Sequence, residues 1–141
     1  MRHVLVADIA GGHIYRADTW IEKVTRFYDH RFGVNAALRD SSVAVWFTQS
    51  TENTAGEGAE ARLFAAADRP MGDGSVWRIA PDEFGRPNPV AVKLVKNLNF
   101  ANGIAHDETR GRVYVAETIG NRVLNFALTL IATRRVTVGC W

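Results

Sequence analysis

Polar side chains recur at one position along this chain, directly after short alternating stretches of apolar residues. Asp8 follows HVLVA, Gln49 follows VWFT, and Glu117 follows VYVA. Carboxylates gathered at one place could hold a metal ion or act as general acid and base. The simpler interpretation is that these residues form hydrogen bonds at the ends of strands or are solvated. We expect the simpler interpretation and keep the carboxylate constellation as its alternative.

Two asparagines also recur, each ahead of one of these alternating stretches. Asn35 lies ten residues before Val45, and Asn102 lies eleven residues before Val113. An asparagine followed by glycine, as Asn102 is, occurs more often in a turn than as a ligand. Spacing alone therefore does not assign either residue a chemical role.

The histidines offer little further chemistry. His106 lies four residues after Asn102 on the same predicted strand, so both side chains are expected on the same face. A lone histidine on a strand is, however, usually structural. The spacing of a metal site is absent from the remaining histidines of the sequence, which are His3, His13 and His30.

Short strands must position all of these residues. Val113 and Val115 fall on one face of the clearest strand, with Tyr114 and Ala116 on the other, which is the period-2 pattern of a half-buried strand. The following Gly120-Asn121 predicts a tight hairpin turn, because such turns need residues with positive φ.

This unit is repeated within the chain. The first copy aligns with the clearest one without a gap, pairing Val4 with Val113, Val6 with Val115, Ala7 with Ala116, Asp8 with Glu117 and Gly11 with Gly120. A further copy covers residues 32–50, where Val45 takes the place of Val113. Repeated units of four antiparallel strands are the pattern of an all-β fold, the β-propeller.

About two and a half blades are predicted, whereas closed propellers have roughly four to eight. We expect a partial blade in residues 1–30, a full blade in residues 31–98 and a partial blade in residues 99–141. The chain is therefore expected to be a fragment, or else to self-associate through its open propeller edges. Residues 51–74 form an insertion with a predicted short helix over 60–68, either a surface excursion or a lid over the ends of the sheets.

Composition agrees with an ordinary globular protein. Of 141 residues, 47% are hydrophobic and 23% are charged, and the formal net charge is +2. Arg134-Arg135 is the only adjacent basic pair, so no nucleic-acid partner is expected. No signal peptide or membrane-spanning run is evident, which predicts a soluble, cytoplasmic protein without a membrane partner. The single cysteine, Cys140, is expected to be incidental.

The segment FANGIAHDETRGRVYVAETIGNRVLNF (residues 100–126) resembles the SMP-30/gluconolactonase/LRE-like family. That family belongs to a superfamily of calcium-dependent six-bladed propellers that includes strictosidine-synthase-like proteins and paraoxonases. The segment VNAALRDSSVAVWFTQST (residues 34–51) resembles the preceding blade of the family, and the two segments stand in the family order. Ala36 departs from the family pattern, which usually has aspartate there. The tail from residue 129 to residue 141 no longer follows it.

The resemblance implies a site as well as a fold. The asparagines of the two family motifs point into the central tunnel and bind a divalent metal, most often calcium; carried over, these are Asn35 and Asn102. Amide oxygens suit calcium, a hard cation that takes six to eight oxygen ligands. The family's acidic ligand and its general base have no counterpart in this sequence.

The function that this resemblance implies is metal-dependent hydrolysis of a lactone or related ester by the parent protein. The metal would polarise the ester carbonyl or activate water. The isolated chain is expected to be inactive, because it carries only two of the ligands. The alternative is a non-catalytic propeller that binds a ligand or serves as a scaffold, as in the strictosidine-synthase-like branch, since fold does not dictate chemistry.

Overall fold

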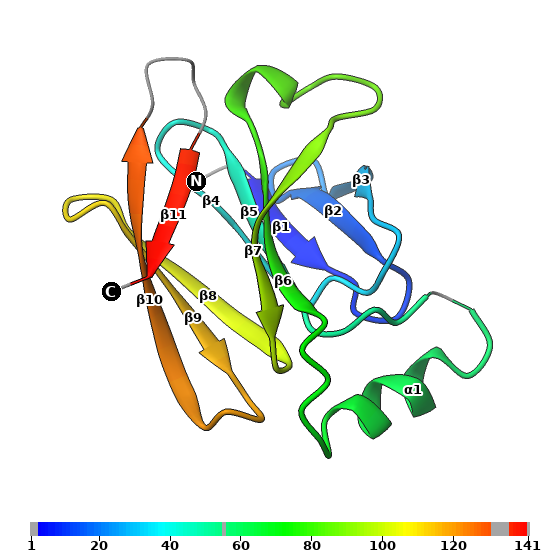
Figure 1. Cartoon of the computed structure of the whole chain (residues 1–141). Coiled ribbons are helices and arrows are strands. Elements are labelled where there is room, and N and C mark those ends of the chain that lie inside the picture. The colour runs from blue at the N-terminus through cyan, green and yellow to red at the C-terminus, as the bar shows by residue number, and fades with distance from the viewer. Residues whose placement is uncertain (1–2, 55, 131–135, 141) are drawn as a thin grey trace.

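The computed structural model describes residues 3–54, 56–130 and 136–140 of the chain. It is all-β apart from one short α-helix and one 3-10 turn in this part of the chain. The strands form three antiparallel sheets that stand side by side (Figure 1). This is the expected architecture of a partial β-propeller, with each sheet as one blade.

Each sheet is a meander in which successive strands are neighbours. The first sheet contains β1 (His3–Ala7), β2 (His13–Asp18) and β3 (Lys23–Asp29). The second contains β4 (Ala36–Arg39), β5 (Val45–Gln49), β6 (Gly74–Ile79) and β7 (Ala91–Leu98), with a 3-10 turn at Pro81–Glu83. The third contains β8 (Ala101–Asp107), β9 (Arg112–Glu117), β10 (Arg122–Leu130) and β11 (Val136–Cys140). The divergent tail thus supplies the end of β10 and all of β11, while Arg134-Arg135 lies outside the described residues.

The internal repeat has the same register in the first and third sheets. Ala7 pairs with Ile14 across the β1–β2 hairpin, and the aligned Ala116 pairs with Val123 across β9–β10. β1 therefore occupies the position of β9, the second strand of a blade. The first sheet contains no counterpart of β4 or β8, the innermost strands, within the described residues.

The sheets pack face to face through apolar side chains of the alternating strands. Between the first and second sheets, the core includes Ile14, Val34, Val45, Phe47 and Ile79, none of which exposes measurable surface. A second core joins the second and third sheets and is built from Trp46, Val76, Leu98, Ala101, Val113, Val115 and Phe126. Val45, Val113 and Val115 thus face the preceding sheet, and Val113 and Val115 share one strand face, as their periodicity predicts.

The insertion after β5 carries the helix α1 (Ala59–Ala66), close to the predicted range. α1 packs through Leu63 and Ala66 against Phe100, which precedes β8, and against Ile9 and Ile119 from the β1–β2 and β9–β10 turns. The helix therefore lies across one end of the sheets (Figure 1). Within the described residues, no helix is long and apolar enough to cross a membrane.

Candidate functional site

Asn35 lies immediately before β4, the innermost strand of the second sheet. Its backbone N–H donates to the carbonyl of Thr48 at 2.9 Å. Its side-chain Nδ2 donates to the hydroxyl of Ser50 at 2.9 Å. These bonds orient the amide, and no donor to its Oδ1 occurs among the described residues.

Asn102 occupies the corresponding place in the third sheet. Its Nδ2 donates to the hydroxyl of Thr118 at 3.1 Å. The β8–β9 register shifts between Ala101 and Ile104, so β8 contains an extra residue at Asn102-Gly103. A β-bulge of this kind redirects side chains and is common beside functional sites. The asparagine therefore lies in a bulged strand and not in a turn. Its longer repeat spacing comes from the hairpin, because Val113 lies seven residues after its partner His106, whereas Val45 lies six residues after its partner Arg39.

Two buried hydroxyl groups link the two asparagine-bearing segments. Thr48 donates from Oγ1 to the backbone carbonyl of Asn102 at 2.6 Å and accepts the N–H of Ala36 at 3.2 Å. Ser50 accepts from Asn35 and donates to the carbonyl of Ala101 at 2.9 Å. The relative position of the two amide groups is thus fixed by direct bonds between neighbouring sheets.

The reasoning from sequence did not single out these hydroxyl residues, although the repeat contained a signal for one pair. Ser50 and Thr118 occupy the same repeat position, directly after Gln49 and Glu117. Each accepts a hydrogen bond from the asparagine of its own sheet. A hydroxyl at this position, paired with an asparagine some fifteen residues earlier, is therefore the more complete motif.

The recurring polar residues Asp8, Gln49 and Glu117 form strand-end hydrogen bonds, as expected. Asp8 accepts the N–H of Gly11 at 2.7 Å within its turn. Gln49 donates from Nε2 to the carbonyl of Asp73 at 3.1 Å. No group of three or more acidic, histidine or cysteine residues suited to a metal occurs in the described part of the chain.

Glu117 is nonetheless a buried charge, with 1% of its surface exposed. Oε1 accepts the backbone N–H of Asn99 at 2.6 Å, and Oε2 pairs with Arg122. Burial by itself raises the pKa of Glu117, but the hydrogen bonds from Arg122 and Asn99 outweigh it and hold the pKa below its ordinary value. Both oxygens of the carboxylate therefore have partners, and they join the β9–β10 hairpin to the segment before β8.

Two histidines lie at the junctions between sheets. The ring of His106 lies 5.5 Å from that of Trp46, and its buried Nδ1 has no hydrogen-bond partner in the described part of the chain. His30 contacts the rings of Phe47 and Trp77 and shares a 3.1 Å hydrogen bond with Gln49. Burial lowers the pKa of His30, although the bond to Gln49 acts in the opposite direction. Both histidines have packing contacts that fit a structural role.

A pocket of about 240 Å³ lies beside α1, at the end of the sheets where β5 leads into the insertion. Its lining includes Asn53, Asp73 and two arginines, Arg62 and Arg69. Nδ2 of Asn53 and Oδ1 of Asp73 are buried without a partner among the described residues. Ser50, the partner of Asn35, directly precedes this insertion.

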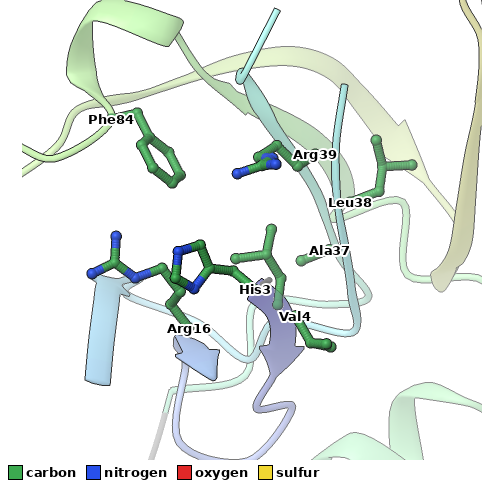
Figure 2. A pocket seen from close by; sticks show the side chains of 8 residues that line it. His3, Val4, Arg16, Ala37, Leu38, Arg39 and Phe84 are labelled. Carbon is green, nitrogen blue, oxygen red and sulfur yellow. The ribbon is translucent and has the colours of Figure 1, made fainter. Parts of the chain in front are cut away.

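A second pocket, of about 290 Å³, lies between β1 and β4 (Figure 2). Its polar groups are all basic and comprise His3, Arg16 and Arg39, while Phe84 and Leu38 contribute to its apolar wall. The guanidinium of Arg39 lies over the ring of Phe84, 5.9 Å from the ring centroid. This pocket differs in charge from the one beside α1.

Comparison with known proteins finds a similar fold in a longer protein, but no match of sequence. No family model and no curated protein matches the sequence. Among solved structures, the chain is similar to the X-ray structure of a protein provisionally named as a gluconolactonase, with a TM-score of 0.60 and 15% sequence identity. The match covers 98% of this chain and 45% of that protein, so the chain spans less than half of its length. A likeness at this identity shows the fold alone.

The side-chain amide oxygens of the two asparagines are atoms of the type that binds a hard divalent cation. Each amide nitrogen is held by a hydroxyl, which leaves a neutral carbonyl oxygen of the type that calcium accepts. Six to eight oxygens normally complete such a shell, so two side chains could supply only part of it.

Proposed function

We propose that this chain is part of a metal-dependent hydrolase of lactones or related esters, in which Asn35 and Asn102 bind a divalent metal, calcium. The observation that supports this most is the matched pair of amides. Both amides lie at the start of the innermost strand of their sheet, and both are oriented by hydroxyl groups at the same repeat position. The likeness in fold to a protein provisionally named as a gluconolactonase agrees with this proposal.

In this proposal the residues of the chain hold and orient, and do not transfer protons. Asn35 and Asn102 would donate carbonyl oxygens, and Thr48 and Ser50 would maintain the separation between them. A metal bound there would polarise a carbonyl or lower the pKa of water. The general base and the acidic ligand would come from outside these 141 residues, so we propose that the isolated chain is inactive.

The alternative function is a propeller that binds a ligand without catalysis. Two observations favour it: the carboxylate of Glu117 at the strand end is already paired, and none of the described residues forms an acidic metal cluster. The two proposals differ in whether the amide oxygens bind a cation at all.

Calcium titration by calorimetry, with the mass of the protein measured by light scattering, tests the proposal. We expect weak, saturable binding in the range of about 10⁻⁴ to 10⁻³ M, because so few ligands are present. Asn35→Ala and Asn102→Ala should each abolish it. The matched control is Asn125→Ala, in an exposed part of β10. Binding that survives both site substitutions, or no binding by a folded wild-type chain, would favour the non-catalytic function.

A further inference from the structure

The inner edge of β1 lacks the neighbour that its counterparts in the other two sheets possess. β5 pairs with β4 and β9 pairs with β8, but β1 pairs only with β2 among the described strands. An unpaired edge presents backbone N–H and C=O groups that can bond to an added strand. Val4 and Val6 of β1 are each 47% exposed, whereas the equivalent Val113 and Val115 are buried.

The repeat fixes where the residues of an added strand would lie. Asp107 pairs with Arg112 and Ala105 with Tyr114 in the third sheet. Since Val4 aligns with Val113, Arg112 corresponds to His3 and Tyr114 to Leu5. A strand added antiparallel to β1 in this register would therefore place the equivalent of Asp107 opposite His3.

Both inner strands of this chain lead into an aspartate at this position. Asp107 is the last residue of β8, and Asp40 directly follows β4. Asp40 is itself bonded to its own sheet, through the N–H of Ala44 at 2.9 Å and the indole of Trp46 at 2.8 Å. An acidic side chain at the end of the inner strand is thus a repeated feature, not a single occurrence.

The pocket beside β1 has the complementary charge. Figure 2 shows the side chains of His3, Arg16, Arg39 and Phe84 around one space next to β1 and β4. The guanidinium groups of Arg16 and Arg39 have no hydrogen-bonding or ion-pair partner among the described residues. Nδ1 of His3 is buried without a hydrogen bond there, and lies 3.6 Å from Oδ2 of Asp18.

We propose that the inner edge of β1 binds an extended peptide segment as an antiparallel strand, with an acidic side chain in the pocket of His3, Arg16 and Arg39. The segment carries a small residue opposite Leu5 and an apolar residue opposite Val6, because Ala105 and Ile104 occupy these positions in the third sheet. Backbone hydrogen bonds supply the affinity, and the basic pocket fixes the register. This inference does not depend on a metal or on hydrolysis.

Fluorescence anisotropy with a labelled peptide tests this site. The peptide has the sequence of residues 99–108, NFANGIAHDE, which contains β8 of this chain. We expect saturable binding by the folded, full-length chain at peptide concentrations up to about 1 mM. Replacing the peptide aspartate with asparagine should weaken binding roughly tenfold, because a charge-assisted contact is lost. A proline in place of the alanine opposite Leu5 should abolish it.

A pair of protein variants separates the pocket from general electrostatics. When Arg16→Gln and Arg39→Gln are combined, the aspartate and asparagine peptides should bind almost equally, whereas Arg69→Gln, a substitution of an exposed arginine in the insertion, should preserve the difference. No binding by a chain whose circular dichroism shows a folded sheet overturns the proposal, as does binding that is insensitive to both peptide changes. If light scattering shows a dimer, the peptide must dissociate it; a dimer that persists at saturating peptide also overturns the proposal.

Discussion

The side-chain hydroxyl of Thr48 donates a 2.6 Å hydrogen bond to the backbone carbonyl of Asn102, joining β5 of the second sheet to β8 of the third. The same hydroxyl accepts the N–H of Ala36. Thr48 exposes none of its surface, so water does not reach the hydroxyl in the folded chain. One threonine therefore satisfies backbone groups on both sides of a sheet junction and fixes the segment that carries a candidate ligand.

Thr48→Val removes the hydroxyl and keeps the shape of the side chain. We expect the free energy of unfolding to fall by about 1–3 kcal/mol, because a partly buried carbonyl and a partly buried N–H each lose a partner. Urea titration followed by tryptophan fluorescence measures this change. Thr109→Val, in the exposed turn between β8 and β9, should change stability by less than about 0.5 kcal/mol. Equal urea midpoints for Thr48→Val and the wild type would contradict the assigned role.

Glu117 should make the fold sensitive to acid. Its pKa in the folded chain lies below its ordinary value, so the ionised carboxylate stabilises the fold above the unfolded pKa of about 4.3. That stabilisation is lost as the pH falls through the lower, folded pKa. Glu117→Gln should therefore flatten the decline of unfolding free energy between neutral and acid pH. Some decline should remain, because the hydrogen bonds from Arg110 also lower the pKa of Asp107.

The control for this experiment is Glu60→Gln, a substitution of an exposed acidic residue in the first turn of α1. Urea unfolding at a series of pH values gives the slope for each variant. An unchanged acid slope in Glu117→Gln would show that its ion pair with Arg122 does not govern the pH dependence.

His30 should report on the core between the first and second sheets. Burial is the main cause of its lowered pKa, and the nearby charge of Lys93 acts in the same direction. The neutral ring is thus favoured in the fold, and its stabilising contribution is lost as the pH falls below the unfolded pKa of about 6.5. We expect its ring signals in NMR to titrate below 6.5. We also expect His30→Phe to reduce the drop in Tm between pH 7.5 and pH 5; a titration midpoint above 6.5 would be incompatible with this.

Gly33 allows close contact between the first and second sheets. A Cβ at this residue would overlap the backbone carbonyl of Ile9, which cannot move as a flexible side chain could. Gly33→Ala should therefore lower the free energy of unfolding by about 1–3 kcal/mol. Gly103→Ala is the matched control, because a Cβ there would meet open space. Thermal unfolding of the two variants should separate them clearly, and equal Tm values would argue against the contact.

Much of the fold could be predicted because the valines of the repeat alternate and recur in register. Val113 and Val115 are buried against the second sheet, as period 2 requires, and Val45 and Phe47 repeat this against the first. The turn at Gly120-Asn121 was also predicted, although only Asn121 has positive φ there, at 48°. The local residue pattern and the observed packing agree at these positions, so the strands and their buried faces can be predicted from the sequence alone.

The site was less accessible to prediction, because its decisive contacts run between sheets. Thr48 bonds to a residue 54 positions away, and nothing in its local sequence indicates that partner. The bulge at Asn102-Gly103 is likewise a consequence of pairing with β9 and not of residue type alone. The metal role of Asn35 and Asn102 remains a prediction, since it rests on a family resemblance that the structural comparison supports only at the level of fold.

The helix of the insertion should be held by its packing and not by its own propensity. α1 has eight residues, and Gly58 provides no side-chain cap at its N-terminus. Helices this short are marginal in water, so the packing of α1 through Leu63 and Ala66 against its neighbours must supply most of the stability. Leu63→Ala should therefore increase amide hydrogen exchange in α1 by at least about tenfold, given the usual cost of truncating a buried leucine. Phe64→Ala, at a neighbouring side chain that is 63% exposed, should leave exchange nearly unchanged. Equal protection in the two variants would mean that the insertion is not anchored over the ends of the sheets, and a lid function would then lose its structural basis.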